Sequence, residues 1–260
     1  MYNNYMSIKF NEVRIISQMK TGNMTFESCN YNNTTNVRIE HCNPDTMEYT
    51  LNTYSNTLII IGVRNPVDRN LSELFQNEFV DKFMVGEHDI NDTYKCKDGY
   101  IYKKDSSDNK IDVYNEDDND NIHLLMNTDP IIDLFLKKDT HYEMSGWFER
   151  CFELTNIKAF DKEVGYSLYT LPNNNTMLIY TVEKLDDNKD EICDKLGITN
   201  FKKKFVGALR WYKNTYANVK SAIAYKKEYL DRLLYNDVMR FFYSDGDIES
   251  FYSKYKLINT

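Results

Sequence analysis

The sequence predicts an α/β fold with a central, mainly parallel sheet, flanking helices and a helical C-terminal part. Two segments rich in β-branched residues, Val13–Gln18 and Leu58–Val63, each end in a turn signal that is followed by a helical pattern. A strand–loop–helix order that occurs twice is typical of parallel sheets, whose strands need crossover connections. From Phe201 to Tyr255 apolar side chains recur at helical spacing, so the last part of the chain is predicted to be mostly helical.

The remaining elements follow from local patterns along the chain. Two more strands and three helices are predicted, at Val37–His41, Met177–Val182, Leu71–Met84, Pro130–Lys138 and Tyr142–Leu154. Residues 104–121 are polar and acidic with almost no apolar anchor, which predicts an exposed insertion. With 260 residues and 42% hydrophobic content, the chain can build one substantial core. A single domain over residues 1–260 that carries this insertion is therefore predicted.

Composition and charge exclude several classes of protein. The net charge is −8 and the pI is about 5.1, and no basic stripe dominates, which argues against nucleic-acid binding. No apolar run reaches the length of a membrane span, and the N-terminus lacks the basic and apolar regions of a signal peptide, so we expect a cytoplasmic protein. The five cysteines are scattered without a C-x-x-C pair, so zinc binding is not predicted and free thiols are expected.

The segment from Leu58 to Gln76 predicts an anion site. Arg64 follows the apolar strand, Pro66 suits the first position of the next helix, and Ser72 lies eight residues after Arg64. Ligands bind outside the carboxyl ends of strands in open α/β sheets, and a guanidinium with a hydroxyl near a helix N-terminus suits an anion. The alternative interpretation is a surface arginine and an ordinary helix serine.

A second turn, which follows the first predicted strand, carries a lysine. Lys20 is followed by Thr21 and Gly22, and then by Asn23 to Thr25, which open a predicted helix. Backbone N–H groups and a lysine in such a turn can hold a phosphate. The loop G-x-x-x-x-G-K-[ST] is absent, because here the lysine precedes the glycine, and this argues against an ordinary ATPase or kinase. The turn is therefore predicted to be a variant phosphate loop.

Together these segments resemble the sulfotransferases that use 3′-phosphoadenosine 5′-phosphosulfate. The turn at Lys20 is similar to their 5′-phosphosulfate loop, and the pair of Arg64 and Ser72 is similar to their 3′-phosphate site. Also common in that family is a late strand that runs into Glu-x-Leu and then a helix that ends in Leu-Gly-Ile, here Glu183 to Leu185 and Leu196 to Ile198. The C-terminal half is most similar to the capsular polysaccharide synthesis branch, through Gly146–Glu149, Phe160–Tyr166, and Phe242–Ser244 followed by Ile248, Phe251, Lys254 and Tyr255.

The resemblance implies a P-loop-like sulfotransferase fold. It also implies an enzyme that moves a sulfuryl group from this donor to a hydroxyl or amine of a carbohydrate, with no metal. Lys20 would neutralise the 5′-phosphate and the leaving oxygen, and Arg64 with Ser72 would fix the 3′-phosphate. The residues implied to bind the nucleotide are Lys20, Thr21, Gly22, Asn23, Thr25, Arg64, Ser72 and Lys220. For Lys220, a solvated lysine on a helix is the alternative.

The general base is implied to lie at the end of the predicted strand Val37–His41. Family members often place a His or Glu there, and imidazole suits the role because its ordinary pKa of about 6.5 lies near neutrality. His41 is the predicted base and Glu40 is its rival, and their alternation along a strand lets only one of them face the cleft. A surface histidine at a strand end is the non-catalytic alternative.

One departure from the family pattern leaves a second function open. Family loops usually carry Ser or Thr where this chain has Asn23 and Met24, and methionine offers no useful donor to a phosphate. An active carbohydrate sulfotransferase is therefore one hypothesis. The other is a sulfotransferase-fold protein that has lost catalysis and serves as a binding or structural module. A small-molecule kinase is disfavoured by the order of Lys20 and Gly22.

Overall fold

The computed structural model describes two compact units. Its described residues are 9–17, 23–31, 34, 36–41, 44–75, 87–89, 94–97, 100–103, 128–137, 145–201 and 213–258. The first unit comprises residues 1–69, 142–204 and 226–260, and the second comprises residues 70–141 and 205–225. The single domain over residues 1–260 stays a prediction, and its acidic insertion near 104–121 lies outside the described residues.

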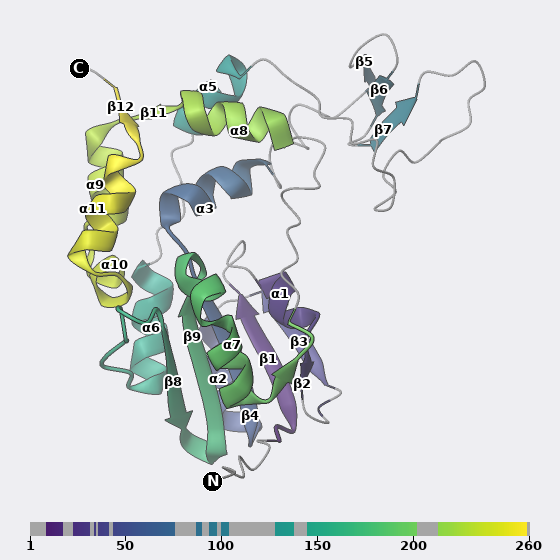
Figure 1. Ribbon diagram of the computed structural model, residues 1–260, viewed down its shortest axis with the longest axis vertical. Helices are drawn as coiled ribbons and strands as arrows, with labels where there is room; N and C mark the ends of the chain where they lie inside the picture. Colours follow the sequence, from purple (N-terminus) through teal and green to yellow (C-terminus); the bar gives the residue numbers. More distant parts are fainter. Residues whose placement is uncertain are drawn as a thin grey trace. The chain divides into compact units, whose positions relative to one another are not determined.

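A five-stranded sheet forms the centre of the first unit (Figure 1). In spatial order its strands are β3 Val37–His41, β1 Glu12–Ser17, β4 Thr57–Val63, β9 Asn175–Thr181 and β8 Tyr166–Leu171. The first four strands run parallel, and β8 pairs antiparallel with β9. The predicted central, mainly parallel sheet is confirmed. Its four predicted strands lie within two residues of the observed ones, whereas β8 was not predicted.

The register of the parallel strands brings their carboxyl ends to one edge of the sheet, here called the carboxyl edge. Ser17, the last residue of β1, lies opposite His41, the last residue of β3. The last residues of β4 and β9, Val63 and Thr181, lie opposite one another. Because β1 and β4 are adjacent and parallel, both strands end at this same edge.

One face of the sheet is covered by α1, Asn23–Glu27, and α7, Leu185–Leu196. The buried cluster on this face includes Val13, Ile15, Leu58, Ile60, Leu178 and Tyr180 from the strands, Phe26 from α1, and Ile192 and Leu196 from α7. All seven residues of β4 are buried, which explains why this strand has no polar alternation in its sequence. Each fully buried Ile or Leu side chain contributes about 1.5–3 kcal/mol to folding.

The opposite face of the sheet carries α2, Pro44–Thr53, and α6, Ser145–Thr155, which pack against each other. The buried Arg14 side chain of β1 contacts Glu12 at 3.1 Å and lies 3.8 Å from the ring centre of Tyr54, directly after α2. Phe148 of α6 packs edge-on against Phe242, with ring centres 4.7 Å apart. The predicted helix Tyr142–Leu154 is confirmed as α6 over its described residues.

Local signals in the sequence explain where the helices of the C-terminal part begin. These are α9 Lys227–Leu234, α10 Asp237–Phe242 and α11 Asp245–Ser253. Asn236 caps α10 by accepting the N–H of Met239. Ser244 and Asp247 form a capping box at the start of α11, in which each side chain accepts a hydrogen bond from the other's backbone N–H. α7 ends at Gly197, whose φ of 65° is the left-handed conformation that glycine adopts readily.

The described residues of the second unit form helices and a small antiparallel sheet. It contains α5 Asp129–Lys137, α8 Lys213–Ala222, and a three-stranded antiparallel sheet of β5 Glu87–Asp89, β6 Tyr94–Lys97 and β7 Tyr100–Lys103. The ring of Phe135 in α5 packs edge-on against Tyr225, and Phe75 packs against Tyr216 of α8 in the same way. The predicted helix Pro130–Lys138 is confirmed as α5.

The remaining elements are short. They are β2 Asn30–Tyr31, η2 Pro172–Asn174, η3 Val182–Lys184, β10 Ile198–Thr199, β11 Ala224–Tyr225 and β12 Lys256–Leu257. Helix α3, Pro66–Glu73, begins at the predicted proline and contains the boundary between the two units. Among the described helices, none is long and apolar enough to cross a bilayer.

Candidate functional site

The carboxyl edge carries three of the residues that the sequence singled out. Arg64 follows β4 directly and is half-buried. His41 is the last residue of β3 and Glu40 precedes it, so both backbone positions lie at or next to this edge, while their side chains lie outside the described part. The predicted phosphate-loop residues Lys20, Thr21 and Gly22 also lie outside the described residues.

The other predicted nucleotide contacts divide between the two units. Helix α1 begins at Asn23, and Thr25 lies in its first turn with a buried side chain. Ser72 is half-buried in the last turn of α3 and Lys220 is exposed on α8, and both belong to the second unit. Arg64 belongs to the first unit, so the proposed pairing of Arg64 with Ser72 stays a prediction.

Asn65 fixes the backbone between β4 and α3. Its side-chain Oδ1 accepts the N–H of Val67 at 3.0 Å, and its backbone carbonyl accepts the N–H of Arg69 at 3.0 Å. Asn65 is therefore the N-cap of α3, and Pro66 at the first helical position has no N–H that would need a partner. The Asn-Pro sequence sets the start of the helix, and Arg64 is the residue just before this cap.

Glu183 accepts a hydrogen bond on each carboxylate oxygen. It lies in the η3 turn that follows β9 at the carboxyl edge. Its Oε1 accepts the backbone N–H of Asn65 at 2.8 Å, and its Oε2 accepts the hydroxyl of Tyr243 at 2.8 Å. Glu183 as a residue is exposed, yet the protein around its carboxylate displaces water and raises its pKa, which the two hydrogen bonds and the charge of Arg64 only partly offset.

The Tyr243 hydroxyl is itself held in a buried position. Tyr243 is 1% exposed and is the C-cap that follows α10, just before the Ser244 cap of α11. Burial first, and then the negative charge of Glu183, raise the pKa of Tyr243 well above its ordinary value, so Tyr243 remains a donor to this carboxylate. The pair of Glu183 and Tyr243 thereby connects the start of α3 to the corner between α10 and α11.

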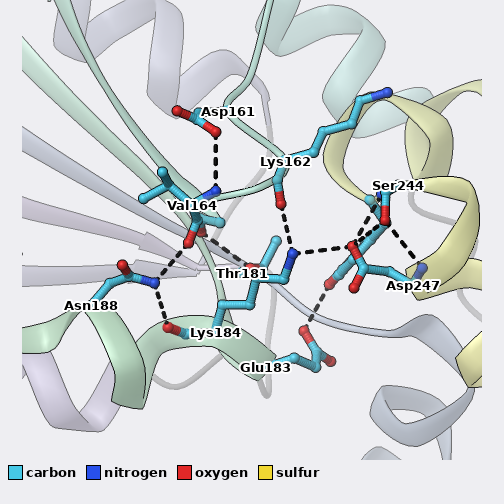
Figure 2. Close-up of polar contacts among 11 residues, drawn as sticks. Asp161, Lys162, Val164, Thr181, Glu183, Lys184, Asn188, Ser244 and Asp247 are labelled. Carbon is cyan, nitrogen blue, oxygen red and sulfur yellow. Dashed lines mark hydrogen bonds and ion pairs between the residues drawn. The ribbon is translucent and has the colours of Figure 1, made fainter.

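Lys184, the next residue, ties together two other segments, as Figure 2 shows. Its Nζ donates to the backbone carbonyl of Lys162 at 2.7 Å and lies 3.1 Å from Oδ2 of Asp247. Partial burial works against ionisation of Asp247, but hydrogen bonds from Ser244 and Lys184 outweigh it and lower the pKa of Asp247. Adjacent residues of one turn therefore bind different parts of the first unit.

The 161–165 loop is shaped by its own hydrogen bonds. Asp161 accepts the N–H of Val164 on its side chain at 3.0 Å and the N–H of Gly165 on its carbonyl at 2.8 Å. The side chain of Asn188 in α7 donates to the carbonyl of Val164 at 2.7 Å (Figure 2). Gly165 has a φ of 85°, and its carbonyl accepts both the N–H and the hydroxyl of Thr181.

A groove of about 620 Å³ runs beside the edge strand β8 and helix α7. Tyr166, Leu168, Tyr169, Glu191 and Lys195 contribute to its lining. The Nζ of Lys195 donates to the Tyr166 hydroxyl at 2.8 Å and pairs with Glu191 at 2.7 Å. Tyr166 lies opposite Tyr180, next to the end of β9, so the groove begins toward the carboxyl edge. Aromatic faces and charged groups occur together in it.

Sequence reasoning gave no function to Glu183, Lys184 or Tyr243, although all three lie in segments that carry the family resemblance. The available signal was a Glu-Lys pair immediately after an apolar strand, where two charges at a buried edge need partners. Within the described ranges, no three or more His, Cys, Asp or Glu side chains are arranged to hold a metal ion.

Comparisons of the chain with protein-family models, with curated proteins and with solved structures found no match.

Proposed function

We propose that this protein transfers a sulfuryl group from 3′-phosphoadenosine 5′-phosphosulfate to a hydroxyl or amine of a carbohydrate. One observation carries the proposal: β1 and β4 are adjacent and parallel. The segment with Lys20 and the residue Arg64 therefore follow neighbouring strands at the same edge, as one nucleotide with phosphates at both ends requires. Together with the sequence resemblance, this arrangement supports a nucleotide site at the carboxyl edge.

The residues present suit such a nucleotide. Arg64 is half-buried, and its positive charge acts on the carboxylate of Glu183. Its guanidinium could bind the 3′-phosphate through two parallel hydrogen bonds. Lys20 would neutralise the 5′-phosphate. The register that pairs Ser17 with His41 supports a base beside the segment that carries Lys20.

The bound nucleotide would supply the sulfuryl group, and the chain would supply positioning and proton transfer. In this proposal His41 accepts the proton of the acceptor hydroxyl, a contribution that is typically about 10²–10⁴-fold in rate. Glu40 is the rival base, because neighbouring residues of β3 point to opposite faces of the sheet. The groove beside β8 supports a carbohydrate acceptor, because its tyrosine faces and polar groups suit the apolar and hydroxyl-bearing parts of a sugar.

Calorimetric titration of two nucleotides tests the site. Arg64→Ala should weaken binding of 3′-phosphoadenosine 5′-phosphate about tenfold or more, because a hydrogen bond to a charged group contributes about 1.5–3 kcal/mol. Ser72→Ala should weaken it in the same direction. Neither change should affect adenosine 5′-phosphosulfate, which has no 3′-phosphate. Arg240→Ala, which removes an exposed arginine of α10, is the matched control and should bind both ligands as the wild type does.

The titration also separates the proposal from its alternatives. Equal losses for both nucleotides would assign Arg64 a structural role instead. The binding-module alternative is favoured by Met24, which lies in the first turn of α1 where the resemblance expects a hydroxyl. A protein that binds 3′-phosphoadenosine 5′-phosphate but transfers no labelled sulfate to a mixed glycan panel would support that alternative. A protein that binds neither nucleotide would overturn both.

A further inference from the structure

We propose that Glu183 is a positioning residue, which holds the backbone at Asn65 and thereby aims Arg64 at its anion. The inference rests on the proposed anion site at Arg64. It assigns the site a carboxylate that does not touch the ligand. Glu183 reaches this backbone from the far part of the sequence, 118 residues away.

The N–H of Asn65 needs an acceptor that only tertiary structure can supply. Asn65 is 2% exposed, so water is a poor partner for its backbone donor. The residue lies before α3, and its side chain already caps that helix by accepting from Val67. The Glu183 carboxylate meets this N–H at 2.8 Å. This N–H belongs to the peptide bond between Arg64 and Asn65. The hydrogen bond therefore fixes the plane of that peptide and with it the backbone orientation at Arg64.

The carboxylate is held in turn by the buried Tyr243, and the turn that carries it is held by Lys184. The hydroxyl of Tyr243 donates to its second oxygen at 2.8 Å. Lys184, next in the turn, is held by the Lys162 carbonyl and Asp247. The Glu183 carboxylate is therefore already oriented to accept the backbone N–H of Asn65. A continuous set of hydrogen bonds runs from the corner of α10 and α11 to the residue beside Arg64.

Positioning and plain charge predict opposite effects on anion binding. The Glu183 carboxylate lies close enough to Arg64 for the arginine's charge to offset part of the rise in the Glu183 pKa that burial causes, so by charge alone Glu183 would repel a phosphate bound there. Removal of the charge would then tighten anion binding. If Glu183 mainly positions the loop, removal of the acceptor weakens anion binding, because the arginine loses its orientation.

Two variants and two measurements separate these effects. Glu183→Ala should weaken binding of 3′-phosphoadenosine 5′-phosphate about tenfold, and should speed hydrogen exchange of the Asn65 amide by about tenfold or more. Glu183→Gln keeps an oxygen that can accept from Asn65 and should restore both values to within about threefold of the wild type. Glu163→Gln removes one exposed carboxylate from the 161–165 loop and is the matched control, for which no change is expected.

A double variant shows whether Glu183 acts through the arginine. In an Arg64→Ala background, Glu183→Ala should cause no further loss of nucleotide affinity, whereas independent contributions would add. An Asn65 amide that exchanges equally fast in Glu183→Ala and wild type would overturn the inference. Faster exchange with unchanged or tighter nucleotide binding would overturn it as well. A wild-type protein that binds no 3′-phosphoadenosine 5′-phosphate overturns the proposed function, and the exchange rate at Asn65 still decides separately whether Glu183 holds the loop.

Discussion

Replacement of Gly165 by alanine should strongly destabilise the first unit. The residue has a φ of 85°, which disfavours any side chain. A Cβ atom placed there would lie 2.6 Å from Cδ and 2.7 Å from Cβ of Lys184, and 2.9 Å from Oγ1 of Thr181. The Lys184 Cβ is attached directly to the backbone, so rotation of the lysine side chain cannot relieve this contact.

Two terms set the size of the effect. The backbone strain costs about 1–3 kcal/mol, and overpacking of a filled site costs about 1–3 kcal/mol more. Together they predict a loss of about 2–6 kcal/mol from the free energy of unfolding, which is a large share of the 5–15 kcal/mol typical of whole proteins. For a body of about 150–250 residues, each kcal/mol lowers the melting temperature by about 2–4 °C, so the fall should be about 4–24 °C.

Thermal and urea unfolding followed by circular dichroism would measure this loss. Gly246→Ala is the matched control, because Gly246 lies in α11 and its nearest non-neighbouring atom, Oγ of Ser244, would be 3.9 Å from a new Cβ. This control should gain about 0.4–1 kcal/mol, because alanine loses less chain entropy on folding. Asparagine adopts a positive φ more readily than alanine but also has a Cβ atom, so Gly165→Asn should still be less stable than the wild type. A Gly165→Ala protein that melts with the wild type would refute the reasoning.

Two further predictions concern pH and turnover. Because the pKa of Asp247 is lowered, its carboxylate stabilises the fold at pH values above the ordinary pKa of 3.8, and this contribution is lost as the pH falls through the lowered pKa. Asp247→Asn should therefore lower the melting temperature at pH 7. The melting temperature of this variant should also fall less than that of the wild type when the pH is taken below 4. Under the proposed function, His41→Ala should reduce sulfate transfer about 10²–10⁴-fold with unchanged nucleotide affinity, whereas Glu40→Ala should leave transfer intact, and the reverse pattern would move the base to Glu40.

The parallel strands were predictable because apolar, β-branched residues mark them in the sequence. β4 is buried on both faces, so its apolar run has no polar interruption and could be recognised without other information. β8 was missed because it lies at the edge of the sheet. Its four inner residues, Ser, Leu, Tyr and Thr, are all exposed or half-buried, so no apolar run marks the strand, and the same composition occurs in loops of this asparagine- and tyrosine-rich chain.

For the candidate site, the sequence could predict only the positions of residues that directly follow a strand. Arg64 lies at the carboxyl end of β4 because the strand and the Asn-Pro cap fix it there. The hydrogen bonds of Glu183 join it to Asn65, 118 residues away, and to Tyr243, 60 residues away. Such long-range hydrogen bonds cannot be predicted from a local sequence pattern, because they arise from the register of β9 against β4 and from the packing of α10.

That register and the order of Glu183 and Lys184 support one another. Val63 pairs with Thr181, so extension of the two strands by two residues brings Asn65 beside Glu183. A slip of one residue would bring Lys184 there instead, next to the cation of Arg64, and would leave the buried Asn65 N–H facing another donor. It would also withdraw Lys184 from Asp247 and from the Lys162 carbonyl. Because the two adjacent charges have different partners, only the observed register satisfies both, and the polar turn at the carboxyl edge thereby helps to specify the pairing of the apolar strands.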